Sequence, residues 1–421
     1  MKKKYSTHCF HFSLFIYTII LFLFIAFCGI SVPFADEWTS VLRPQFMWLD
    51  GSITWIQLLR YSVNEHFLPL SRVFIHFFPW NHYDPKIFMF FSAFIQVLTI
   101  HFFYLGLNKE LPEVRKKPFV FFTSFIILTG FSQKINVTMG LQIFWSITYL
   151  GIVLFFYGLN FRHFLSLVLG FVLVAGNMSI WIFLFLIFLL FFAFTYTQDK
   201  DRFLLYKKKI FVSFFILSLL SLLVLACKPS VSYNDHSSLP SSLIDLLKFH
   251  LWFLASPFSR YQEVLIYIFS LLFYFLLAHF LYTKNVKEKL FTVSYLILTF
   301  STSFLIGFFR SGGSLSLKYA ASGHYLIFIL PSWVLLISHF IVEEKKILLR
   351  KGFALSLIFL TCIISFREVY KEWSMRSVQL EEAKKCLNTS QRTIDCNLKL
   401  EALIHTKNKE RNDLIKKWIG N

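Results

Sequence analysis

Two adjacent carboxylates, Asp36 and Glu37, follow the first long apolar run of the chain. A carboxylate at a membrane surface can act as a base toward a hydroxyl group, and the low dielectric constant near lipid raises its pKa toward the useful range. The alternative is a solvated acidic cap after a helix, and the residue types alone favour neither interpretation over the other. Neighbouring side chains on a helix point about 100° apart, so only one of the pair can face a cavity. We favour Asp36 as the base.

A third carboxylate and an imidazole lie downstream in Asn64-Glu65-His66. These side chains are candidates for binding a substrate beside the acidic pair. The alternative is a helix start, with Asn64 as the N-cap and Glu65 in the first turn, where a negative charge is favourable. The two interpretations are compatible.

A late polar segment begins at Arg310 and continues through Lys318 to Gly323-His324-Tyr325. Arginine and lysine at the level of lipid headgroups are suited to binding a phosphate. The alternative is an ordinary short polar loop. Gln142, at the start of an apolar segment in the middle of the chain, is a weaker candidate for lining a cavity, and packing is the favoured role for it.

Long apolar helices must position these residues. The 421 residues are 56% hydrophobic, and the mean hydropathy is +0.61. About 20 apolar residues in a helix cross the roughly 30 Å hydrocarbon core of a bilayer. The sequence therefore predicts an all-α polytopic bundle of about eleven spans. We place these spans at residues 10–30, 86–107, 118–131, 140–158, 164–177, 178–197, 210–227, 263–282, 290–308, 324–342 and 352–366.

The charge distribution predicts the orientation of the bundle. If the N-terminus is cytoplasmic, the cytoplasmic loops hold 20 Lys and Arg and the longer outer loops between spans hold nine. This asymmetry follows the positive-inside rule. It predicts an extracytoplasmic C-terminus and fits a bacterial inner membrane. Because the basic residues lie between spans, the net charge of +19 does not indicate nucleic-acid binding.

The transmembrane domain is predicted over residues 1–366, followed by a short extracytoplasmic helical tail over 367–421. The first outer loop, 31–85, holds the acidic motif. Segments with helical spacing of apolar residues predict interfacial helices along the outer leaflet. These are Ile53–Tyr61 and Glu65–Phe78 in the first outer loop, and Leu243–Phe253 in a second long loop.

The apolar cores of the predicted spans contain no Asp, Glu, Lys or Arg. Ion-coupled transporters usually carry such residues near the midplane, so the absence disfavours a pump or symporter. Isolated polar residues in the spans, such as Gln96, His101 and His279, are expected to form hydrogen bonds between helices.

Together these features resemble the GT-C class of membrane glycosyltransferases. Asp36-Glu37 match the acidic motif of that class after the first helix, and Arg310 with Lys318 matches its late basic motif. The closest likeness is to uncharacterised bacterial GT-C-like proteins with a DEW-type first loop, an Asn-Glu-His segment, a Gly-x-Gln and a final Arg-Tyr pair. Here His324-Tyr325 replaces that last pair, which leaves the role of residue 324 open. The resemblance in layout covers residues 1–366.

The resemblance implies that a sugar moves from a polyprenyl-phosphate donor to a cell-envelope glycan or lipid acceptor on the outer face of the membrane. Arg310, with Lys318 or His324, would hold the phosphate and stabilise the leaving group. Asp36 or Glu37 would be the base for a single inverting displacement. The substrate-binding residues would also include Asn64, Glu65, His66, Gln142 and Tyr325. The class allows a divalent cation, Mg²⁺ or Mn²⁺, at the acidic pair, or no cofactor.

Two other functions stay open. An O-antigen-type polymerase or ligase also has many spans and basic outer loops, but its largest outer loop tends to lie late, whereas the longest loop between spans here is the first. A transporter or flippase of lipid-linked glycans would require a charged central cavity, which the spans do not provide.

Overall fold

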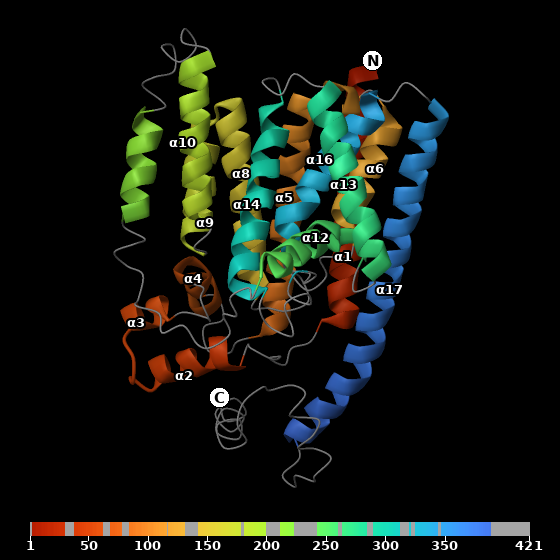
Figure 1. Cartoon of the computed structure of the whole chain (residues 1–421). Helices are drawn as coiled ribbons and strands as arrows, with labels where there is room; N and C mark the ends of the chain where they lie inside the picture. Colours follow the sequence, from red (N-terminus) through yellow and green to blue (C-terminus); the bar gives the residue numbers. More distant parts are fainter. Residues whose placement is uncertain are drawn as a thin grey trace.

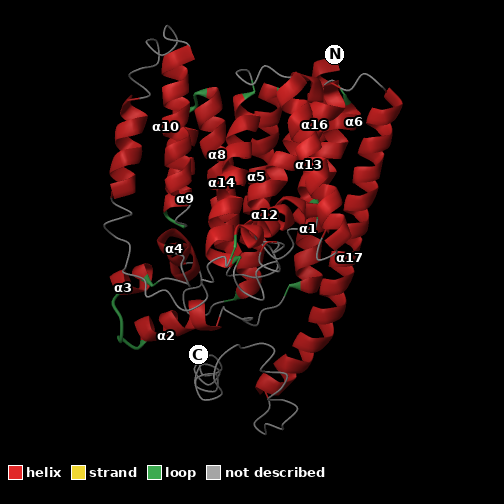
Figure 2. Ribbon diagram, in the orientation of Figure 1, coloured by secondary structure: helices red, strands yellow, loops and turns green. Residues whose placement is uncertain are grey.

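The computed structural model describes residues 2–29, 38–61, 68–77, 84–115, 117–130, 142–177, 181–198, 211–222, 242–259, 263–283, 289–311, 320, 325–343 and 347–388. Within these ranges the chain is helical and contains no strand (Figure 2). The predicted all-α class is therefore confirmed at this level. Seven of the predicted site residues lie outside the described ranges: Asp36, Glu37, Asn64, Glu65, His66, Lys318 and His324.

The long helices run side by side and form a bundle (Figure 1). Their bounds are α1 Lys2–Cys28, α5 Pro85–Glu110, α6 Pro118–Thr129, α8 Ile143–Phe161, α9 Phe164–Ala175, α10 Trp181–Gln198, α13 Glu263–Thr283, α14 Leu290–Arg310, α16 Leu326–Glu343 and α17 Ile347–Asn388. A further helix spans Phe211–Leu222. Shorter elements are the π-helix η1 Trp38–Leu42, α2 Arg43–Leu49, α3 Trp55–Arg60, α4 Pro69–Phe77, the 3-10 helix η2 Pro112–Arg115 and α12 Leu243–Ser259.

Among the described residues, seven helices are long and apolar enough to cross a membrane. They are α1, α5, α8, α13, α14, α16 and the Leu348–Lys371 part of α17. The other four predicted spans coincide with α6, α9, α10 and Phe211–Leu222. Two of these, α6 and α9, have only 12 residues, about 18 Å of helix, which is shorter than a hydrocarbon core, and Phe211–Leu222 is the described part of a third. The helical membrane bundle is confirmed, and the count of eleven spans stays a prediction.

Alternating helix directions bring the predicted loops together in two groups. At one end, Lys289 Nζ donates to the Glu110 carbonyl (2.8 Å), and Lys117 Nζ donates to the Val342 carbonyl (3.1 Å). We call the opposite end, which carries α2, α3 and α4, the loop end (Figure 1). There Lys86 Nζ donates to the Ala26 carbonyl (2.9 Å). Each of these ammonium groups satisfies a carbonyl near a helix C-terminus, which has no intrahelical donor.

Glycines set the closest helix pair, α8 and α9. A Cβ added at Gly158 would lie 2.3 Å from the Leu167 nitrogen, and one added at Gly170 would lie 2.3 Å from the Phe155 nitrogen. Only hydrogen fits at these positions, so the two backbones approach as in small-residue membrane interfaces. Arg162, with φ of 60°, ends α8 in the left-handed conformation and turns the chain into α9.

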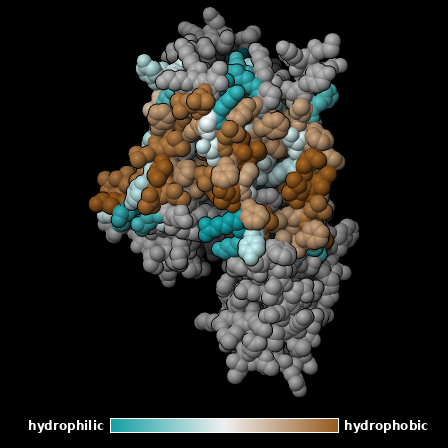
Figure 3. Space-filling view, turned by 90° about the vertical axis from the view of Figure 1, so that its right-hand side faces the viewer, coloured by the Kyte–Doolittle hydropathy of each residue, from teal (hydrophilic) through white to brown (hydrophobic). Residues whose placement is uncertain are grey.

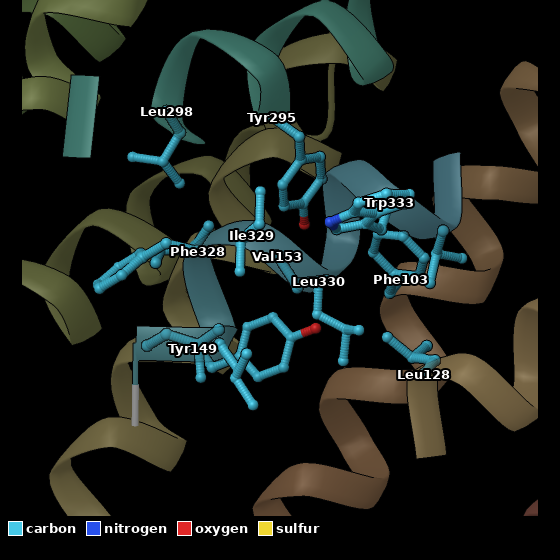
Figure 4. Packing of buried hydrophobic residues seen from close by; sticks show 14 of the residues in the cluster. Phe103, Leu128, Tyr149, Val153, Tyr295, Leu298, Phe328, Ile329, Leu330 and Trp333 are labelled. Atoms are coloured by element: carbon cyan, nitrogen blue, oxygen red, sulfur yellow. The ribbon is translucent and has the colours of Figure 1, made fainter. Parts of the chain in front are cut away.

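The core of the bundle is aromatic and aliphatic, with Trp333, Tyr149 and Tyr295 buried at its centre (Figure 4). The hydroxyls of both tyrosines are buried and have no hydrogen-bond partner. Gln96 Oε1 is buried and unpaired too, so this atom does not make the hydrogen bond between helices that is predicted for Gln96. On the outside, apolar residues gather in a band around the middle of the face in Figure 3, as expected for contact with lipid.

Helices are present in all three predicted loop segments; the placement along the outer leaflet stays a prediction for α3 and α4 and is partly wrong for α12. α3 and α4 fall within Ile53–Tyr61 and Glu65–Phe78. α12 begins at Leu243 as predicted, but from Phe249 onward it is buried against α13, α14 and α16 instead of lying along the surface. The sequence of this half is almost entirely apolar, so it favours the interior of the bundle over an interface.

Candidate functional site

The short helix α4 is fixed to the bundle at the junction of α9 and α10. Its Leu70 N–H donates to the Gly176 carbonyl (3.0 Å), and its Ser71 N–H donates to Asn177 Oδ1 (3.0 Å). Asn177 Nδ2 donates in turn to the Leu173 carbonyl (2.9 Å). An amide from another segment thus satisfies the free donors at the start of α4. α9 ends at Ala175, and Gly176 and Asn177 form the turn that follows it.

Arg72, on α4, is a buried cation. Its side chain is 2% exposed. Nε donates to the Tyr61 carbonyl (3.3 Å), Nη1 donates to the Ser40 carbonyl, and the guanidinium lies 5.4 Å from the centre of the Tyr61 ring. Nη2 makes no hydrogen bond, and no carboxylate in the described part of the chain pairs with the guanidinium. Burial lowers the pKa of Arg72 to about 10, so the group stays charged at neutral pH.

His76 lies one turn beyond Arg72 on the same face of α4 and is also buried, with 6% exposed. Neither of its ring nitrogens has a hydrogen-bond partner. Burial, followed by the neighbouring charge of Arg72, lowers the pKa of His76 to about 3. The imidazole is therefore neutral at physiological pH. One of its nitrogens carries a proton and can donate it to an anion without adding a second buried charge.

A buried cation is costly unless it is paired, and among the described residues no carboxylate pairs with Arg72. The Nη2 group of Arg72 and the imidazole of His76 together offer at least two free donors and a positive charge. That combination fits an anion with several oxygens, such as a phosphate.

Arg72 is also joined to the segment that follows the acidic pair. Its Nη1 contacts the carbonyl of Ser40 in η1, and Glu37 precedes Ser40 by only three residues. The described part of this segment begins at Trp38, directly after the acidic pair, and the acidic pair itself lies outside the described residues.

Two of the predicted site residues, Gln142 and Tyr325, lie near each other. Gln142 occupies the N-cap position of α8, and its Oε1 is buried without a hydrogen-bond partner. Tyr325 precedes α16, is 6% exposed, and packs edge-on against Trp145 with ring centres 5.7 Å apart. Trp145 is three residues from Gln142 in the same helix. The two residues are thus joined through Trp145, and their predicted role in binding a substrate stays a prediction.

Arg310 is the last residue of α14, and its side chain lies outside the described part of the chain. The next residue, Ser311, donates its N–H to the Gly307 carbonyl (2.8 Å) and is 5% exposed. Its Oγ is buried and has no hydrogen-bond partner. A polar atom left open beside Arg310 fits the prediction that this turn faces a ligand.

The sequence analysis missed Arg72 and His76 as site residues. The signal was present, because an Arg and a His four residues apart share one face of an amphipathic helix. Gln45, on α2 in the same loop, was missed as well, and its Oε1 is buried and unpaired. Nothing in the types of these residues separates a buried polar side chain from a solvated one.

A second polar cluster lies at the end opposite the loop end. Glu110, from α5, accepts the N–H of Phe291 (2.7 Å) and the N–H and hydroxyl of Thr292 at the start of α14. His339 Nε2 lies 3.3 Å from the same carboxylate, and His339 Nδ1 lies 3.9 Å from Glu343. The carboxylate caps α14 and ties three helices together, which is a structural role. No group of three or more His, Cys, Asp or Glu among the described residues is arranged to hold a metal.

These features define a helical membrane bundle with buried, incompletely paired polar groups at its loop end. No protein-family model, curated protein or solved structure matches the chain.

Proposed function

We propose that this chain is a membrane glycosyltransferase that moves a sugar from a polyprenyl-phosphate donor to a glycan or lipid acceptor of the cell envelope. The loop end would face away from the cytoplasm, as the distribution of Lys and Arg predicts. The observation that carries the proposal is Arg72, a buried cation with an open Nη2, bonded to the segment that follows Asp36-Glu37.

In this proposal the donor phosphate binds the free donors of Arg72 and His76 and the basic side chains of the late segment, Arg310, Lys318 and His324. Gln142, Asn64, Glu65, His66 and Tyr325 would contact the sugar or the acceptor. These contacts would hold the phosphate as negative charge develops on its bridging oxygen, which lowers the barrier to departure.

The reaction would be a single displacement. Asp36 or Glu37 takes the proton of an acceptor hydroxyl, the hydroxyl oxygen bonds to the anomeric carbon, and the bond from that carbon to the phosphate oxygen breaks. The products are an inverted glycoside and polyprenyl phosphate. A Mg²⁺ or Mn²⁺ ion at the acidic pair is compatible with this scheme, and the scheme does not require one.

The test uses the full chain in nanodiscs with short-chain polyprenyl-phosphate sugars, each radiolabelled in the sugar, and a cell-envelope extract as acceptor. We expect one donor to pass its label to the acceptor. Loss of the base should lower the rate about 10²–10⁴-fold in the Asp36→Asn, Glu37→Gln double variant. Glu263→Gln, at an exposed carboxylate at the start of α13, is the matched control and should keep the rate. Full activity in the double variant would refute the assignment.

The same assay separates the alternatives. A polymerase or ligase would transfer a preformed lipid-linked oligosaccharide and not the monosaccharide donors. A flippase would move the lipid-linked sugar between leaflets without breaking the glycosyl bond; in sealed vesicles, an impermeant oxidant added outside would reveal this movement as a change in the protected share of the label.

A further inference from the structure

Helix α12 enters the bundle without crossing it. Its buried half contacts α16 through Trp333 Nε1, which donates to the Leu254 carbonyl (2.8 Å), and contacts α13 through Ser270 Oγ, which donates to the Leu251 carbonyl (2.7 Å). Trp333 lies seven residues inside α16, about 10 Å from its start. α12 is therefore a re-entrant helix that lies between the loop end and the middle of the bundle (Figure 1).

A hydrogen-bonded histidine joins α12 to α14. His250 is 2% exposed, its Nδ1 is hydrogen-bonded to Ser303 Oγ (2.6 Å), and its Nε2 is hydrogen-bonded to Tyr274 OH (2.7 Å). Its ring stacks on Phe304 at 4.6 Å and 11°. Both nitrogens are used, so this imidazole links α12 to α14 and α13 at once.

A close approach lies one turn further along α14. A Cβ added at Gly307 would lie 2.8 Å from Leu246 Cδ1 and 3.0 Å from Phe249 Cδ1. α12 thus contacts α14 at residues 303 and 307, two successive turns of one helix face. Arg310, three residues after Gly307, is the last residue of α14, and Ser311 is its C-cap.

We infer that α12 holds the last two turns of α14 in place, and that His250 and Gly307 are positioning residues for Arg310. This inference rests on the proposed function, in which Arg310 binds the donor phosphate. These contacts of α12 add side-chain packing and a hydrogen bond to the backbone hydrogen bonds of the end of α14. Helix ends with fewer packing contacts open more often than the rest of a helix, so loss of these contacts would leave the backbone that carries Arg310 ordered for less of the time.

The first test does not depend on activity. Hydrogen exchange of the amides of residues 303–311 is measured in the whole protein in nanodiscs. His250→Phe keeps the stacked ring and removes both hydrogen bonds, and it should speed exchange roughly 10-fold. The matched control is His279→Phe, at a half-buried histidine of α13 that contacts the Phe340 ring and whose Nε2 is unpaired. Equal exchange in the two variants would overturn the inference.

The second test separates positioning from general support. Gly307→Ala should raise the KM for the donor about 10-fold and change kcat by less than about 3-fold, because binding and not proton transfer is affected. Adding Leu246→Ala removes the atom that the new methyl group meets and should restore KM. Faster exchange with an unchanged KM would refute the positioning role. If the wild-type chain uses none of the donors, the proposed function is refuted. The hydrogen-exchange data would then still test whether α12 stabilises the last two turns of α14.

Discussion

Replacement of Arg72 by Met should remove donor binding while the protein stays folded. The lowering of the Arg72 pKa from 12.5 to about 10 corresponds to a burial cost of about 3 kcal/mol. Against this cost stand two hydrogen bonds from a charged donor, each worth about 1.5–3 kcal/mol, and a cation–π contact worth about 0.5–2 kcal/mol. The net contribution of Arg72 to folding is therefore small, and we expect Arg72→Met to lower the unfolding free energy by about 1–3 kcal/mol.

Donor binding should respond more strongly. A charge-assisted hydrogen bond from Nη2 to a phosphate is worth about 1.5–3 kcal/mol, which corresponds to a rise of about 10- to 150-fold in KM. Arg72→Lys should be intermediate, because one ammonium cannot reach both carbonyls and the ligand. Arg60→Met, at an exposed arginine of α3, is the matched control. The assay pairs donor titration with thermal unfolding in the same nanodiscs. If Arg72→Met unfolds the protein and the folded fraction keeps a normal KM, Arg72 only stabilises the first outer loop and does not bind the donor.

Three further predictions concern stability, read from thermal unfolding. Because the folded-state pKa of His76 is about 3 and the usual value is 6.5, the folded state should lose stability as pH falls below 6.5, by up to roughly 5 kcal/mol near pH 3. His76→Leu should lose less stability over the same pH range. If the wild type and this variant lose stability equally with pH, the burial of His76 is not the cause. Glu110→Gln should cost about 3–5 kcal/mol because it breaks a buried pair with His339, whereas Glu113→Gln in η2 should cost less than about 0.5 kcal/mol. Gly158→Ala should cost about 1–3 kcal/mol by forcing α8 from α9, while Gly352→Ala, with open space around it, should be neutral or stabilising; similar effects would refute the packing argument.

The helices were predictable because their signal is long and redundant. A span such as Leu326–Glu343 needs nearly 20 apolar residues, and no single substitution hides that pattern. The grouping of helix ends was predictable for a similar reason, since a bundle with alternating directions leaves few arrangements. α12 was placed wrongly in part because its apolar half satisfies an interface and a protein interior equally well, and only the partners on α13 and α16 decide between them.

The candidate site was less predictable, because its chemistry depends on burial. Gln142 was named from its place at the start of a span and Tyr325 from the resemblance to a final Arg-Tyr pair, and both are linked to Trp145. From the sequence, Arg72 was only one of nine basic residues in the outer loops. In the structure it is buried, whereas Arg60, twelve residues earlier, is exposed. That difference arises because α4 is fixed by Asn177, more than one hundred residues away in the sequence, and no local pattern contains that contact.

The length of α17 has a mechanical consequence. Its 42 residues form one helix of about 63 Å, twice the roughly 30 Å core of a bilayer, and its far half extends past the ends of the other helices (Figure 1). An unbroken helix resists bending over this distance, so it acts as a lever whose fulcrum is the contact with α6 and α1. A small tilt within the bundle would become a displacement of several ångströms at Asn388. A load applied outside the bundle would, by the same geometry, be delivered as torque to the helices that carry the first loop.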